Sequence, residues 1–189
     1  MKFIIGFLVS IGLLIFVFVL IFRGGGSSTA PKAGPKLLDY ANSSVVMQLT
    51  TDSPISADQT HRQTRLTVGS AESTVEVFQG YQQTLISSKS YPNNPASYAD
   101  FLSALQLAGY TLGNNDKKLA DERGYCATGS RYVMGIKDGN QDVQRFWSSS
   151  CGGIASFKGK TALVNDLFRR QFPGYAKDTA AFGQYSVGL

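Results

Sequence analysis

The chain has 189 residues, 43% of them hydrophobic, and a formal net charge of +5. Once the atypical first 36 residues are set aside, the remaining length suits a single domain with its own core. Four of the eighteen basic residues precede residue 37, which leaves fourteen basic against thirteen acidic residues. This near balance, with no basic run among the aromatic residues, argues against nucleic acid as a partner.

The first predicted element is a membrane-spanning helix. Residues 3–22 read FIIGFLVSIGLLIFVFVLIF and contain no charge and no proline. Twenty helical residues cross a hydrocarbon core of about 30 Å. A cleaved signal peptide is the alternative, but the apolar run exceeds the usual ~7–15 residues, and Pro31 directly follows the small-residue site. We therefore expect residues 1–22 to anchor the protein, with the lipid bilayer as the partner of residues 3–22.

A second alternative concerns the head of this apolar segment. Gly6-Phe7 resembles the cleavage point of type IV prepilins. That family has a glutamate at the fifth residue after cleavage, where this chain has Ile11. A pilin-like subunit is therefore kept only as a minor alternative.

A flexible linker is predicted next. Residues 23–36 read RGGGSSTAPKAGPK, and their glycine, serine and proline disfavour a stable helix or strand. Residues 37–175 are expected to form the domain, and the weakly patterned residues 176–189 a C-terminal tail.

The domain is predicted to have an α+β fold, with a mostly antiparallel sheet and two helices on one face. Apolar alternation predicts strands at 44–50, 65–68 and 74–78, and a shorter extended piece at 84–87. Asn94 and Pro95 suit the start of a helix that Gly109 ends, and a second apolar stripe predicts a helix at 161–172. Residues 114–124 carry many charges and are expected to be a solvated loop.

The two cysteines, Cys126 and Cys151, flank a predicted hairpin. Asp138-Gly139 suits the two central positions of a type I′ turn, so Lys137 would pair with Asn140. Continuing this register outward places Cys126 opposite Cys151, where opposing side chains approach closely. We therefore expect a disulfide between them.

The disulfide also predicts the compartment. Disulfides persist in oxidising environments, so the domain should lie outside the cytoplasm of a single-pass protein of the cell membrane. Two cysteines and the single histidine, His61, do not supply the ligands of a zinc site, so no metal is expected.

No catalytic residues or cofactor are assigned from the sequence. His61 has Asp52 and Asp58 nearby and could act as a base, but its polar surroundings favour a solvent-facing side chain. Three tyrosines close to glycines or on the predicted hairpin are candidate binding aromatics, because a tyrosine ring is both apolar and hydrogen-bonding. They are Tyr81, Tyr125 and Tyr132.

Three segments in the last third of the chain carry a resemblance. They read CATGSRYVMGIKDG, RFWSSSCGG and LFRRQFPGY. In them the chain resembles a group of single-pass envelope proteins, without an assigned activity, from small-genome bacteria of candidate phyla. The resemblance implies a bacterial surface location and supplies no catalytic residues.

Two classes of function follow. The favoured hypothesis is a membrane-tethered binding or structural module of the cell envelope, engaging an envelope protein or a glycan. The alternative is an envelope enzyme, for instance a hydrolase, whose carboxylates or His61 come together only in the fold.

Overall fold

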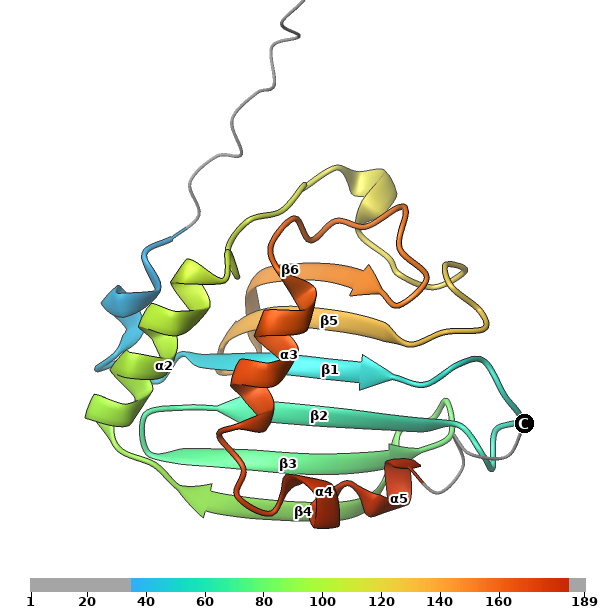
Figure 1. Ribbon diagram of the computed structural model, residues 1–189, viewed down its shortest axis with the longest axis horizontal. Helices are drawn as coiled ribbons and strands as arrows, with labels where there is room; N and C mark the ends of the chain where they lie inside the picture. The colour runs from blue at the N-terminus through green and yellow to red at the C-terminus, as the bar shows by residue number, and fades with distance from the viewer. Residues whose placement is uncertain (1–34, 184–189) are drawn as a thin grey trace, which may run out of the picture. The chain divides into compact units, whose positions relative to one another are not determined.

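A computed structural model describes residues 35–183, which form a six-stranded antiparallel sheet with helices on one face (Figure 1). The strand order is β4-β3-β2-β1-β5-β6. The strands are β1 (Val46–Asp52), β2 (Arg62–Val68), β3 (Glu72–Gln79), β4 (Thr84–Pro92), β5 (Arg131–Asp138) and β6 (Gln141–Ser149). The helices are η1 (Leu37–Tyr40), α2 (Pro95–Leu107), η2 (Lys117–Leu119), α3 (Thr161–Arg169), α4 (Tyr175–Asp178) and α5 (Ala180–Gly183).

The expected α+β architecture is confirmed for the described residues. Alternation along the central strands directs Met47 and Leu49 of β1, and Leu66 and Val68 of β2, into the core. Because successive strand residues point to opposite faces, the intervening polar side chains lie on the face away from α2 and α3. The sheet therefore separates a packed face from an open one.

Helix α2 begins where the sequence predicts. The Asn94 side chain accepts a hydrogen bond from the Ser97 N–H at 3.0 Å, and Pro95 takes the first helical position. Gly109, with φ of +77°, follows the helix end. Tyr98, Phe101, Leu102 and Leu105 of α2 are buried.

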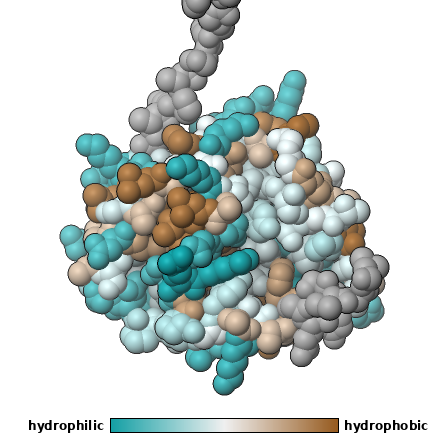
Figure 2. Space-filling view, in the orientation of Figure 1, coloured by the Kyte–Doolittle hydropathy of each residue, from teal (hydrophilic) through white to brown (hydrophobic). Residues whose placement is uncertain are grey.

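Helix α3 completes the cover of the packed face. Its Phe168 ring meets Phe101 of α2 edge-on, with ring centroids 5.1 Å apart. The helix ends at Arg169, earlier than the predicted 161–172. Figure 2 views this side of the domain and shows hydrophobic side chains gathered over the helix layer. Leu107, the last residue of α2, is 82% exposed.

Strand β4 differs from the expectation of a short piece at 84–87. It continues to Pro92 and pairs with β3 along its length. The segment SSKSYP lacks apolar alternation because β4 is an edge strand whose side chains are mostly exposed. Backbone pairing with β3, rather than burial of its side chains, defines this strand.

The predicted register of the β5–β6 hairpin is wrong. Asp138 pairs with Gln141, so Gly139 and Asn140 form the turn. A type I′ turn needs positive φ at both central residues, whereas a type II′ turn needs it only at the first. Gly139 has φ of +55° and Asn140 does not have a positive φ, so the turn fits type II′. A bulge between Ile136 and Lys137 then shifts the pairing again, so Met134 faces Phe146 and not Val143.

The disulfide is confirmed, although by another route than the predicted register. Cys126 and Cys151 are bonded, with Cα atoms 5.6 Å apart. Cys126 lies before β5, with φ of +54°, and its carbonyl accepts the Gly129 N–H at 3.2 Å. This turn folds Cys126 back over Gly129, where an added Cβ would lie 2.6 Å and 3.1 Å from the two sulfurs. Only glycine fits at this position.

The residues after α3 pack onto the sheet edge. Asp178 of α4 accepts a hydrogen bond from the Tyr91 hydroxyl of β4 and forms an ion pair with Lys89 at 3.5 Å. The Tyr91 hydroxyl, followed by Asp178, raises the pKa of Lys89. Within the predicted tail, α4 and α5 are thus short helices, and residues 184–189 lie outside the described residues.

The predicted anchor at residues 1–22 also lies outside the described residues, as does most of the linker at 23–36. Between residues 35 and 183, none of the helices has the length and apolar character needed to span a bilayer.

Candidate functional site

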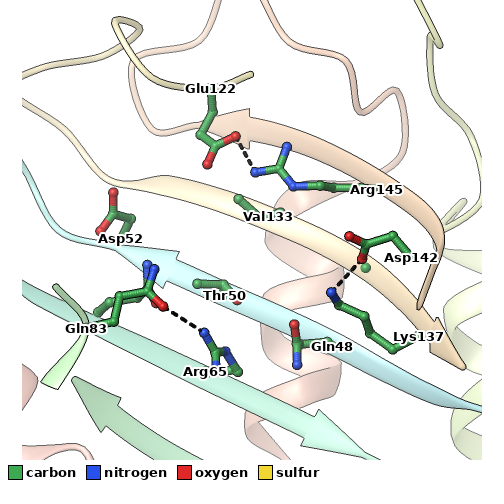
Figure 3. A pocket seen from close by; sticks show the side chains of 12 residues that line it. Gln48, Thr50, Asp52, Arg65, Gln83, Glu122, Val133, Lys137, Asp142 and Arg145 are labelled. Atoms are coloured by element: carbon green, nitrogen blue, oxygen red, sulfur yellow. Dashed lines mark hydrogen bonds and ion pairs between the residues drawn. The ribbon is translucent and has the colours of Figure 1, made fainter. Parts of the chain in front are cut away.

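The open face of the sheet contains a polar groove. Its first hollow has a volume of about 160 Å³ and lies over β1, β2, β5 and β6 (Figure 3). Its second hollow, of about 380 Å³, lies towards the turn after β3. The two hollows share the lining residues Asp52, Gln63, Gln83 and Glu122, and together we call them the sheet-face groove.

Alternation along the strands builds the floor of the groove. On β1, Gln48, Thr50 and Asp52 point to the open face, whereas Met47 and Leu49 between them are buried in the core. The same period places Gln63 and Arg65 of β2 on one side of them, and Val133 and Gly135 of β5 on the other. The floor of the groove is therefore polar over β1 and β2, and β5 adds Val133 and Gly135 to it.

The loop between α2 and β5 forms a wall along the β6 side. Trp147 points to the open face, yet it is fully buried because this loop covers it. The Trp147 Nε1–H donates to the Leu119 carbonyl at 2.6 Å, and the Tyr125 ring lies 4.9 Å from the indole. Arg145 donates to the Ala120 carbonyl at 2.8 Å and forms an ion pair with Glu122 at 2.5 Å. The loop therefore holds Glu122 at the edge of the groove.

The outer part of this loop is solvated, as predicted. Asp121 and Arg123 form an exposed ion pair at 2.6 Å. Hydrogen bonds from Arg123 lower the pKa of Asp121 to about 2. The buried indole and the Glu122 position were not predicted, since both depend on contacts with β6.

A buried charge cluster lies at the end of the groove. Asp52 receives Arg131 Nη2 at 2.5 Å on one oxygen and lies 2.8 Å from His61 Nε2 with the other. Arg131 and His61 are each only 3% exposed. Arg131 also donates to the Ser53 carbonyl at 3.1 Å. Asp52 of β1 therefore joins Arg131 of β5 to His61, the residue before β2, through one carboxylate.

The expectation of a solvent-facing His61 is wrong. His61 precedes β2 and takes the same face as Gln63 and Arg65, because alternation along the chain carries over. The Tyr81 ring then stacks on it, with centroids 4.1 Å apart and planes at 15°. The residues next to His61 in the sequence are polar and give no sign that the ring is buried. It is buried because Tyr81, from the turn after β3, covers it.

Of the three candidate tyrosines, the structure brings only Tyr81 to the groove. Its ring is 49% exposed, and its hydroxyl donates to the Ser56 carbonyl at 2.9 Å. Tyr125 packs on Trp147 behind the wall. Tyr132 points to the other face of the sheet and packs against the core. The three therefore do not form one binding surface.

The charges in the groove are paired within the protein. Lys137 meets Asp142 at 2.6 Å, as Arg145 meets Glu122 and Arg131 meets Asp52. Arg65 has a longer ion pair than these three residues, because its carboxylate partner, Glu76, lies 3.9 Å away. Arg65 instead donates to the Gln83 side chain at 3.2 Å and lies over the Phe78 ring.

Several polar atoms at the floor of the groove have no hydrogen-bond partner within residues 35–183. They are Gln63 Oε1, Arg65 Nε and Arg131 Nε. A buried polar group without a partner costs about 1–3 kcal/mol. Such atoms gather where a protein leaves hydrogen bonds to water or to a ligand.

No protein-family model matches the chain, and no curated protein is significantly similar to it. The chemistry of the groove must therefore be judged from its own residues. Within the described residues, no three histidine, cysteine or carboxylate side chains are grouped to hold a metal ion. The groove can offer hydrogen-bond donors, acceptors and one aromatic ring.

Proposed function

We propose that the protein is a membrane-tethered binding module of the cell envelope, which holds a polar ligand in the sheet-face groove. The observation that carries this proposal is the buried cluster of Asp52, Arg131 and His61 at the end of a hollow of about 380 Å³. Burying charges is costly, and proteins often retain such clusters where they serve a site. The half-exposed Tyr81 adds a ring at the same place.

Three features support the proposed cellular location of this module. The Cys126–Cys151 bond favours an oxidising compartment. The uncharged run at residues 3–22 has the length of a membrane span. The resemblance in the last third of the chain points to an envelope protein. Under this proposal the domain lies outside the cytoplasm and is anchored at its N-terminal side.

The full chain tests both parts of the proposal. The membrane fraction of cells expressing it is isolated and then denatured with a thiol-alkylating reagent, without reductant. The mass of the protein then shows whether its two cysteines are alkylated. Two unmodified, bonded cysteines in the membrane fraction are expected. Two alkylated cysteines, or a chain outside the membrane fraction, would contradict the proposed location.

Binding is tested separately on the detergent-solubilised chain. Soluble fragments of envelope material should raise the thermal midpoint of the wild-type protein but not of Arg65→Glu, which reverses a charge on the groove floor. Arg170→Glu, on the exposed side of α3, is the control and should respond as wild type. No response from the wild type to any fragment would overturn the binding function.

A hydrolase is the second candidate, because the fold brings a serine to the histidine. Ser53 Oγ lies 3.2 Å from His61 Nδ1, and Asp52 lies at the other ring nitrogen. Ser53 could thus act as a nucleophile, with His61 as the base and Asp52 orienting the ring. However, Ser53 Oγ also accepts the Arg62 backbone N–H at 3.1 Å, and Ser53 is not among the residues lining the groove. We therefore rank binding first.

A fluorophosphonate probe distinguishes the two candidates. The hydrolase predicts covalent labelling of the native protein that is lost in Ser53→Ala. A binding module predicts no labelling of the wild type. Labelling that persists in Ser53→Ala would place the reactive group elsewhere and contradict this serine relay.

A further inference from the structure

We infer that the ligand of the sheet-face groove is a neutral oligosaccharide that carries amide groups, that is, a chain of N-acetylated hexosamines. This inference rests on the proposed binding function and names the ligand class for the same site. It follows from the charge, the hydrogen-bonding groups, the aromatic ring and the shape of the groove.

Charge argues against an anionic or cationic ligand. Each lysine or arginine that lines the groove has a carboxylate partner within the protein, and Arg131 and Arg145 have theirs at 2.5 Å. An anion would have to compete with these carboxylates, and a cation with these bases. Pairs that are already satisfied leave little net field for a charged ligand. A neutral ligand needs no such exchange.

The floor matches a ligand that both donates and accepts hydrogen bonds. Gln48, Gln63 and Gln83 each provide an amide donor and an acceptor, and Thr50 adds a hydroxyl. Sugar hydroxyls have the same dual character. The groove is therefore suited to a polyhydroxylated surface rather than to an apolar one.

An amide on the ligand is favoured by two neighbouring strand positions. Among the described residues, Gln63 Oε1 is an acceptor without a hydrogen-bond partner and Arg65 Nε is a donor without one, and both lie on the same face of β2. An amide group supplies one N–H and one C=O, which would satisfy both. A small rotation of the Arg65 and Gln63 side chains is required, because both atoms are covered in the free protein. Arg65 is also the groove cation with the most distant carboxylate.

Tyr81 supplies a platform for a sugar ring. One face of its ring is supported by His61, and its hydroxyl and main chain are held by Ser56 and Asp58. A ring fixed in this way loses little freedom when a ligand packs on its exposed surface. The platform lies beside the larger hollow.

The shape indicates more than one sugar unit. The two hollows share four lining residues and continue from β6 across β5 and β1 to the turn after β3. The larger hollow alone falls in the range of about 300–1,000 Å³ that is usual for small-molecule sites. An oligomer can occupy both hollows, with an amide over Arg65 and a ring on Tyr81.

Binding is measured by calorimetry with the full chain in detergent micelles. The probes are the hexamers of N-acetylglucosamine, glucosamine and glucose, the last in its β-1,4 form, and an oligomer of galacturonic acid. We expect the N-acetylated hexamer to bind about tenfold or more tightly than each of the others, because only it supplies the amide. Arg65→Ala and Tyr81→Ala should each weaken this binding by about tenfold, and Arg170→Ala should not change it.

The outcomes separate the inference from the function on which it rests. Equal binding of the glucose and N-acetylglucosamine hexamers, or preference for the uronic acid oligomer, would overturn the ligand class and leave the binding function in place. If no sugar binds while envelope fragments still raise the thermal midpoint, the ligand is not a glycan. If neither sugars nor fragments have any effect, the proposed function falls as well.

Discussion

Asp52 and Arg131 are direct partners across the β1–β5 pair, and their side chains meet at 2.5 Å above the sheet. The arginine side chain is 4% exposed, so its charge depends on this carboxylate. The pair joins residues 79 positions apart in the chain and positions the His61 ring.

The first prediction concerns this pair. Asp52→Asn should lower the free energy of unfolding by about 3 kcal/mol, because it leaves Arg131 buried without its counter-charge. Arg131→Met in the Asp52→Asn background should recover part of the loss. Urea unfolding of four proteins, the wild type, Asp52→Asn, Arg131→Met and the double variant, gives the coupling energy. The exposed Asp166–Arg170 pair on α3 is the matched control, with an expected coupling of about 0.5 kcal/mol or less. Equal coupling in the two pairs would contradict the importance of burial.

The second prediction concerns the disulfide. Cys126→Ser should cost about 2–4 kcal/mol of unfolding free energy. Gly129→Ala should also destabilise the oxidised protein, because the added Cβ would lie 2.6 Å from Cys126 Sγ and 2.4 Å from Ser150 Oγ. Unfolding is followed with and without reductant. If Gly129→Ala destabilises the reduced protein by the same amount as the oxidised one, the clash with the disulfide is not its cause.

The third prediction concerns alkaline pH. Burial raises the pKa of Tyr98 and Tyr110 above the ordinary value of 10.0, so the folded state keeps protons that the unfolded state loses. The contribution of these tyrosines to the free energy of unfolding should be constant below about pH 10. Above that pH it should fall by up to ~1.4 kcal/mol per pH unit for each tyrosine. Urea unfolding between pH 8 and about pH 11 measures the slope.

Tyr110→Phe is the control for this pH effect. The variant should lose about 1 kcal/mol near neutral pH, because the hydroxyl donates to the Gln48 and Gly135 carbonyls at 2.7 Å and 2.9 Å. Above pH 10 its stability should fall less steeply than that of wild type. An unchanged slope would show that Tyr110 does not contribute to the alkaline loss.

The fourth prediction concerns the wall of the groove. Arg145→Ala removes the contacts to Glu122 and to the Ala120 carbonyl, so amide hydrogen exchange should increase in residues 117–125. Global stability should change by about 1 kcal/mol or less, since the arginine is partly exposed. Arg123→Ala, which removes a neighbouring exposed pair, should leave the exchange of these residues nearly unchanged. Similar protection in both variants would contradict a wall held by Arg145.

Local signals in the sequence predict the elements well. Helix α2 carries its cap, its first-turn proline and its apolar stripe within fifteen residues, and each strand with apolar alternation was found. The edge strand β4 lacked that signal because its partner, not its own side chains, determines it. The predicted register of the hairpin was wrong because the turn lies one residue later than expected and a bulge shifts the pairing by one more residue. The pattern of hydrophobic residues encodes neither feature.

The groove was harder to foresee. His61 and Asp52 lie close in the sequence, but Arg131 joins them from a strand much later in the chain. Tyr81 covers His61 from the turn after β3. Alternation from Gln63 and Arg65 back to His61 is the one local signal that could have indicated a shared face. No local signal in the sequence indicates the position of Glu122, because contact with β6 positions its loop.

The bond between Cys126 and Cys151 ties the base of the groove wall to the end of β6. A chain in which this bond has not formed has both thiols free. The loop carrying Glu122 is then held by noncovalent contacts alone, among them the Arg145–Glu122 ion pair and the packing of Tyr125 on Trp147. Formation of the bond would therefore fix this end of the loop at the edge of the groove. The single tryptophan beneath this wall is a built-in reporter of that step, because its emission should shift when the loop closes over it.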